Sequence, residues 1–127
     1  MPSTRILVID DDPDLTTLFH DILEDEGYSV VAASGPLDSV DISQLRPGLI
    51  VLDLWFGHKT SGWDQLHQLR ATPGVRDIPV LVCTGDSRAA REATGCLRAL
   101  DADVILKPFD LDDFLGRVAA TCGPGSR

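Results

Sequence analysis

Five short runs of apolar and β-branched residues alternate with segments of helical spacing, and this alternation constrains the fold more than any other feature. The runs that we assign to strands are 6–9, 29–33, 49–52, 78–84 and 104–106. Each run is followed by a segment that can return across a sheet as a helix, so we expect parallel strands joined by right-handed crossovers. The pattern therefore predicts an α/β fold with helices on both faces of one parallel sheet.

Capping residues mark the ends of the first and last predicted helices. Asp12 is placed to cap a helix that begins at Pro13, and Gly27 marks the end of that helix. Asp110 is placed to cap the last helix. We expect one domain over residues 1–122 and a flexible Gly/Pro tail over residues 123–127.

Length and charge exclude several classes of function. A chain of 127 residues has room for one domain with a sizeable core. A formal charge of −9 repels phosphate backbones, so we expect no direct binding to nucleic acid. The apolar runs are much shorter than a membrane span, and the first strand begins too early for a signal peptide. We therefore expect a cytoplasmic protein without membrane contact.

The cysteines and histidines carry no recognisable site. Cys83, Cys96 and Cys122 are far apart and form no CxxC pair, so we expect reduced and mostly buried thiols. The three histidines lack metal-ligand spacing with any cysteine. The chemistry must therefore be sought among other residue types.

Acidic and polar residues stand where the predicted strands end. Asp10 and Asp11 follow the first strand, Asp53 the third, Thr84 ends the fourth and Lys107 follows the fifth. Ligands of open α/β sheets bind beyond the carboxyl ends of the strands. We therefore expect three carboxylates, a hydroxyl and an ammonium group to meet at one edge of the sheet.

Three neighbouring carboxylates repel one another, and a divalent cation that prefers oxygen ligands, such as Mg²⁺, removes this repulsion. A carboxylate such as Asp53 can then act as the nucleophile toward a phosphoryl group. Lys107 would neutralise charge on the transferring group, and the hydroxyl of Thr84 would bond to its oxygens. The residues alone thus indicate a site that accepts phosphate.

Four segments together resemble a known family. They are ILVIDDD (6–12), LIVLDL (49–54), IPVLVCTG (78–85) and LKPF (106–109). In this order they resemble the receiver domains of response regulators, the CheY-like superfamily of two-component signalling, from residue 5 to about 121. The resemblance implies a flavodoxin-like three-layer sandwich with strand order 2-1-3-4-5.

The resemblance also implies the ligands of Mg²⁺. Asp53 is the expected phosphoacceptor and a metal ligand, and Asp11 is the expected direct ligand from the first strand. Asp10 would bind the ion through water, and the backbone carbonyl of Trp55 would complete the protein ligands.

Further roles follow from the same resemblance. Lys107 is the expected phosphate-pairing lysine, with a cis bond to Pro108, and Thr84 is the expected switch hydroxyl. The phosphoryl donor would be a phosphohistidine on a sensor histidine kinase or a histidine phosphotransfer protein. A homodimer would use the face formed by the helix at 87–100, the strand at 104–106 and the last helix.

Three departures from the family pattern affect the site. Gly57 stands where the family usually has Pro, and Gly62 comes one residue later than usual, so we expect a longer and more mobile loop after Asp53. Val104 stands three residues before the lysine, where the family commonly has an aromatic residue that turns inward. A β-branched aliphatic side chain cannot make that movement.

Three other functions compete with the signalling receiver. The first is a degenerate receiver that binds proteins without phosphorylation, which Val104 and the altered loop favour. The second is a phosphatase of the haloacid-dehalogenase type, which needs a second carboxylate where Trp55 stands. The third is a flavodoxin, which needs a phosphate-binding loop where this chain has the acidic residues 10–12.

Overall fold

The computed structural model describes residues 4–35, 37–54, 61–85, 88–107 and 109–123. The strands are β1 (Arg5–Ile9), β2 (Ser29–Ala33), β3 (Leu49–Leu52), β4 (Val80–Gly85) and β5 (Ala102–Lys107). The helices are α1 (Pro13–Asp25), α2 (Ser39–Leu45), α3 (Ser61–Ala71), α4 (Arg88–Ala99) and α5 (Leu111–Cys122). All strands pair in parallel in the order β2-β1-β3-β4-β5, which confirms the predicted flavodoxin-like α/β fold.

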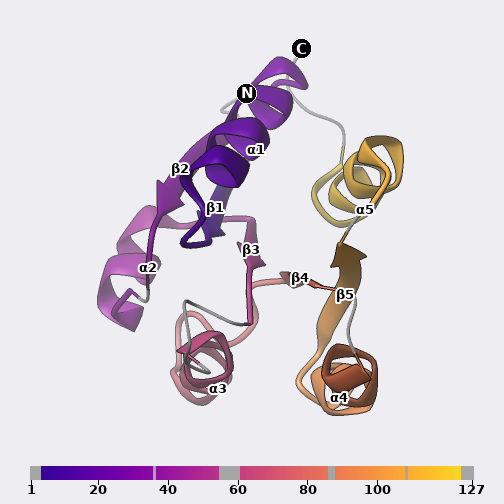
Figure 1. Ribbon diagram of the computed structural model, residues 1–127. Helices are drawn as coiled ribbons and strands as arrows, with labels where there is room; N and C mark the ends of the chain where they lie inside the picture. Colours follow the sequence, from indigo (N-terminus) through magenta and orange to yellow (C-terminus); the bar gives the residue numbers. More distant parts are fainter. Residues whose placement is uncertain (1–3, 36, 55–60, 86–87, 108, 124–127) are drawn as a thin grey trace.

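Helices cover both faces of the sheet. Figure 1 shows α1 and α5 on one side, with α2, α3 and α4 on the other. Side chains alternate along each strand, so β1 sends Ile6 and Val8 into one core and Leu7 and Ile9 into the other. The central strands β1 and β3 are thus buried on both faces, as their continuous apolar runs predict.

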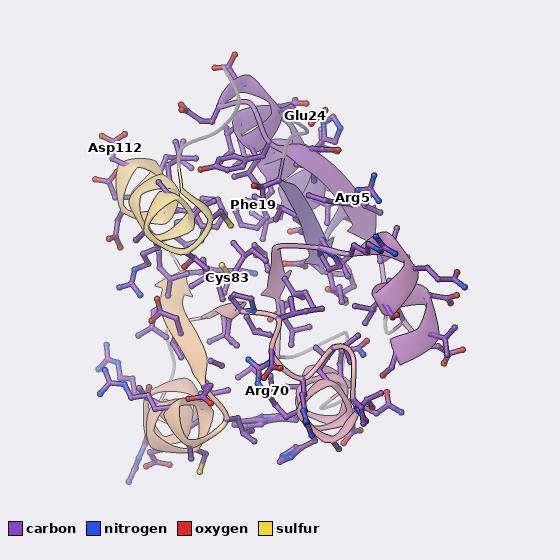
Figure 2. The ribbon with its side chains drawn as sticks, turned by 180° about the vertical axis from the view of Figure 1, so that it is seen from behind. Arg5, Phe19, Glu24, Arg70, Cys83 and Asp112 are labelled. Atoms are coloured by element: carbon purple, nitrogen blue, oxygen red, sulfur yellow. The ribbon has the colours of Figure 1, made fainter. Side chains whose placement is uncertain are left out.

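An aromatic cluster joins the helices of the first face. Phe19 of α1 stacks on Phe114 of α5 with ring centroids 4.7 Å apart, and Phe109 lies 5.4 Å from Phe114. Figure 2 shows Phe19 on the side of the sheet that also carries α5. This packing holds α5 against α1 beside the carboxyl ends of the strands.

The predicted caps are confirmed. The Asp12 carboxylate accepts hydrogen bonds from the backbone N–H groups of Asp14 (3.0 Å) and Leu15 (3.4 Å), directly before Pro13. Gly27 follows α1 with a φ of 96°, a conformation that glycine adopts without strain. Asp110 caps α5 through the N–H of Asp112 at 2.9 Å.

β4 and β5 differ from the predicted runs by up to two residues at their ends, and β1 begins one residue earlier than predicted, at Arg5. β5 extends over Ala102–Lys107, because it pairs with β4 at every position from Val80↔Ala102 to Gly85↔Lys107. β4 begins at Val80, because the N–H of Ile78 turns back to the carbonyl of Val75 at 3.1 Å. Pairing with β4 thus sets the length of β5, whereas a local turn sets the start of β4.

The three cysteines are free thiols, as expected, but they are not mostly buried. Cys83 is buried and Cys122 half-buried, and burial raises the pKa of both thiols. Cys96 is exposed on α4, whose inward position is taken by the next residue, Leu97. The expectation was therefore wrong for Cys96.

A hydrogen bond ties the residue that follows α5 to the rest of the fold. The Tyr28 hydroxyl donates a 2.7 Å hydrogen bond to the carbonyl of Gly123, so the bonds of the fold reach that residue. Residues 124–127 lie outside the described part of the chain, and the flexible tail stays a prediction. None of the helices in the described ranges has the length and apolar character needed to cross a bilayer.

Arg70 ties together the loops at the amino ends of β4 and β5. Its guanidinium donates to the carbonyls of Leu100 (2.7 Å), Ile78 (2.8 Å), Arg76 (3.0 Å) and Asp101 (3.2 Å). Figure 2 shows this side chain at α3, directed toward α4. One planar cation thus satisfies carbonyls from two separate turns.

We expect Arg70→Lys to lower the free energy of unfolding by about 2 kcal/mol, because an ammonium group cannot reach four carbonyls from one position. Urea denaturation would measure the loss. Arg98→Lys on the exposed surface of α4 is the matched control and should change the value by less than about 0.5 kcal/mol. Equal losses in both variants would contradict the role of Arg70.

Candidate functional site

The backbone register of β1 and β3 places Asp10 beside Asp53. Ile9 pairs with Leu52, and the N–H of Asp53 donates to the carbonyl of Ile9 at 3.0 Å. The N–H of Asp10 donates to the carbonyl of Ala33 in β2 at 3.1 Å. The ladder thus continues one residue beyond the strands, and both carboxylates start from fixed backbone positions.

Three carboxylates converge at this edge, as the sequence predicts. Oxygen atoms of Asp10, Asp11 and Asp53 all lie within 4.8 Å of one another. Asp10 is 3% exposed and Asp53 9% exposed, whereas Asp11 is exposed. The cluster is therefore mostly desolvated, with its opening to solvent at Asp11.

Lys107 supplies the cation of the cluster. Its Nζ lies 3.3 Å from Oδ2 of Asp10 and 3.9 Å from Oδ2 of Asp53. The other oxygen of Asp10, Oδ1, accepts the N–H of Asp12 at 3.0 Å. Both oxygens of Asp10 are thus engaged by the protein. Three close carboxylates carry more negative charge than the Lys107 ammonium group neutralises, which favours an additional cation.

Thr84 lies at the end of β4 with a buried hydroxyl. Val82 pairs with Leu52, so Thr84 lies two residues further along β4, toward the edge that carries Asp53. Its side chain is 0% exposed, and its Oγ1 has no hydrogen-bond partner among the residues that the structure describes. A buried hydroxyl without a partner is costly, which points to a polar group that enters the site.

Helix α3 begins directly beside the Asp53 end of β3. The N–H of Gly62 donates to the carbonyl of Leu54 at 3.1 Å. A methyl group at Gly62 would collide with the carbonyl of Asp53 and would lie 2.5 Å from Cα of Leu54. The sequence indicates Gly62 only as a change in the length of the loop. The contact with the Asp53–Leu54 backbone could not be predicted, because it depends on how α3 packs.

Cys83 lies under the site on the opposite face of β4. It is 1% exposed, and Figure 2 shows it on the side of the sheet that carries Phe19. Burial raises the pKa of its thiol above the usual range, Lys107 opposes the rise, and Asp10 and Asp53 add to it. The thiol therefore stays protonated and contributes no nucleophile.

The donors of the site fit Mg²⁺. All the acidic ligands are oxygen atoms, they lie close enough to share one ion, and the site opens to water at one side. Trp55, Gly57 and Pro108 lie outside the described residues, so the carbonyl ligand, the altered loop and the cis bond stay predictions.

Comparison with known proteins identifies the family. The sequence model described as the response regulator receiver domain matches residues 6–119 of the chain. The protein therefore belongs to the receiver domains of two-component signal transduction. Members of this family are signalling domains rather than turnover enzymes, which sets aside both the phosphatase and the flavodoxin.

Individual relatives agree with this assignment. The chain is 38% identical, over 91% of its length, to the DNA-binding dual master transcriptional regulator RpaA of Synechocystis sp.. It is 34% identical, over 93% of its length, to the response regulator MprA of Mycobacterium bovis. It spans 48% and 50% of these relatives, about half of each.

Solved structures show the same fold. The N-terminal domain of a response regulator receiver protein from Methanoculleus marisnigri JR1 has a TM-score of 0.70 at 29% identity, with 91% of this chain and 94% of that chain covered. A sensor protein from Polaromonas sp. JS666 has a TM-score of 0.81 at 23% identity, with coverages of 95% and 97%.

We expect Gly62→Ala to lower the free energy of unfolding by about 2 kcal/mol, because the methyl group would push α3 away from the Asp53–Leu54 backbone. Gly95→Ala in α4 is the matched control. Among the described residues, no atom beyond the chain neighbours and the backbone of α4 itself lies within 4 Å of a methyl group at Gly95, so alanine should raise the value by up to about 1 kcal/mol. Chemical denaturation would compare them, and the same sign in both would contradict the contact.

We expect Thr84→Val to leave the free energy of unfolding unchanged or to raise it by about 1 kcal/mol, because the buried hydroxyl has no hydrogen-bond partner among the described residues. The control is Thr72→Val. Its hydroxyl donates to the carbonyl of Gln68 at 2.7 Å, so its loss should destabilise the protein by about 1 kcal/mol. Thermal or urea unfolding that gave both variants the same loss would show that Thr84 has a partner.

Proposed function

We propose that the domain, over residues 1–122, accepts a phosphoryl group on Asp53 in the presence of Mg²⁺ and then changes its binding to a partner. One observation carries the proposal: carboxylate oxygens of Asp10, Asp11 and Asp53 lie within 4.8 Å of one another. The Lys107 ammonium group lies against two of these side chains.

The surroundings of each carboxylate support separate roles in holding Mg²⁺. Asp11 is exposed and stands at the open side, which suits a direct ligand. Asp10 is bonded to the N–H of Asp12 and faces Lys107, which suits contact with the ion through water. In the proposal Asp53 and the carbonyl of Trp55 complete the protein ligands. Bound Mg²⁺ would supply charge neutralisation for the carboxylates and for the incoming phosphoryl group.

The residues of the chain divide the transfer among them. An oxygen of the Asp53 carboxylate forms a bond to phosphorus while the bond from phosphorus to the donor breaks, and the donor atom keeps the electron pair. Lys107, 3.9 Å from Asp53, is placed to pair with a phosphoryl oxygen. The Thr84 hydroxyl would donate to another phosphoryl oxygen and so gain its missing partner.

The proposed donor is a phosphohistidine on a sensor histidine kinase or a histidine phosphotransfer protein. Its imidazole nitrogen would keep the electron pair of the broken bond. The negative charge of −9 supports protein partners rather than nucleic acid for this domain.

A homodimer through the α4–β5–α5 face belongs to the same proposal. A hollow of about 610 Å³ lies along β5 between α4 and α5. Charged groups of both signs line it, including Arg98 of α4 and Asp103 of β5, which suits a self-complementary contact.

The degenerate receiver is the alternative that the same experiment separates. Val104 is only partly buried on β5 and has no ring to turn inward. Such a domain would bind its partner with the acidic site unmodified.

We expect acetyl phosphate with Mg²⁺ to add the mass of one phosphoryl group to the protein, because the metal relieves the repulsion among the carboxylates. Intact-mass measurement would detect the gain, and chelation of Mg²⁺ or Asp53→Asn should abolish it. Asp41→Asn, on the exposed surface of α2, is the matched control and should keep the gain.

Size-exclusion elution of the same samples would report dimerisation. A mass gain that persists in Asp53→Asn would contradict Asp53 as the acceptor. No gain in the unmodified sequence would favour the degenerate receiver.

A further inference from the structure

Gln65 is a buried amide inside α3 whose bonds leave the helix. Its side chain is 1% exposed. Its Oε1 accepts the backbone N–H of Leu37 at 2.7 Å, and its Nε2 donates to the carbonyl of the same residue at 3.0 Å. One side chain thus binds both backbone groups of a single residue in the loop between β2 and α2.

The helix that carries Gln65 also packs on Asp53 and Leu54 at the end of β3. Gly62 lies one turn earlier, its N–H bonds to the carbonyl of Leu54, and its Cα lies against the backbone of Asp53. Residues three apart lie on the same side of a helix. Helix α3 therefore connects the end of β3 to Leu37 through two attachments within one turn.

The loop that Gln65 holds begins at the acidic site. The carbonyl of Ala33, at the end of β2, accepts the N–H of Asp10 at 3.1 Å. Ala33 and Ser34 line a cavity of about 230 Å³ together with Asp10 and Asp11. Ala33 and Ser34 thus form a wall beside the carboxylates, and Leu37 lies three residues beyond Ser34.

A buried amide is stable only while both of its hydrogen bonds are made. Movement of Leu37 away from α3 would leave the buried amide of Gln65 without these two hydrogen bonds. Movement of α3 relative to the end of β3 would break the same two hydrogen bonds between Gln65 and Leu37. The position of Leu37 and the position of the Asp53–Leu54 segment therefore depend on each other.

We propose that Gln65 is a positioning residue that couples the β2–α2 loop to the acidic site, so that a cation in the site and the hold on Leu37 stabilise each other. The inference rests on the proposed function only in that this site is taken to bind Mg²⁺. It assigns Gln65 no contact with the ion or with phosphate.

The amide hydrogen of Leu37 reports the coupling directly, because its bond is to Gln65. Hydrogen exchange by NMR on the unmodified protein should show this amide slowing by about fivefold or more when Mg²⁺ is added. In Gln65→Met, which keeps the volume of the side chain but not its bonds, Mg²⁺ should leave the exchange of Leu37 unchanged. Gln68→Met, an exposed position on the same helix, should keep the slowing.

Coupling is reciprocal, so the dissociation constant of Mg²⁺ should rise in Gln65→Met by the factor by which Mg²⁺ slows the Leu37 exchange. Calorimetric titration would measure it against Gln68→Met. Equal affinities in these variants would overturn the proposal. Should Gln65→Met not fold, the unmodified protein still decides, since an exchange rate of Leu37 that ignores Mg²⁺ overturns it.

The amide of Asp53 separates this inference from the proposed function. Slowing at Asp53 without slowing at Leu37 overturns only the role of Gln65. Absence of slowing at both amides overturns the metal site together with the coupling. Slowing at both amides in a protein that acetyl phosphate does not modify supports the coupling while the phosphoacceptor proposal fails.

Discussion

The site depends on one constraint. The backbone hydrogen bonds of the sheet hold three carboxylates close together although their charges repel one another. The N–H groups of Asp10 and Asp53 are bonded into the sheet, so these side chains cannot separate without loss of strand pairing. Burial removes most of the water that would otherwise screen their charges. The fold therefore concentrates negative charge at one edge of the sheet, and the Lys107 ammonium group neutralises part of it. The apolar cores on both faces of the sheet make this arrangement stable.

The sequence predicts the fold well because its signals are local and repeated. Short apolar runs and helical spacing define the elements, and Asp12, Pro13 and Gly27 mark α1 because a helix end must satisfy its own backbone groups. The length of β5 was missed, since it depends on pairing with β4, and no local pattern reveals a partner. The exposure of Cys96 was missed because a single thiol does not state which face of α4 turns inward.

The site, like the fold, has some residues that the sequence predicts and others that only the packing defines. The five side chains at the strand ends could be predicted because parallel topology brings strand ends to one edge, whatever the details of packing. Gln65 could not, because the same residue type stands at position 68 of the same helix and is exposed there. Only the rotation of α3, fixed by the contact of Gly62 with the end of β3, turns one glutamine toward Leu37 and the other toward solvent.

Charged side chains bind the backbone of the outer strand β5. At β5, the N–H of Val104 donates to the Asp103 carboxylate at 2.9 Å, and its carbonyl accepts a 2.7 Å bond from Arg117 of α5. Arg117 also lies 3.2 Å from Asp103, so side chains occupy the backbone groups through which an edge strand recruits another strand. A partner at the α4–β5–α5 face therefore meets charged side chains rather than open backbone. Its affinity should then depend on charge pairing and on ionic strength, since exposed ion pairs are screened by salt.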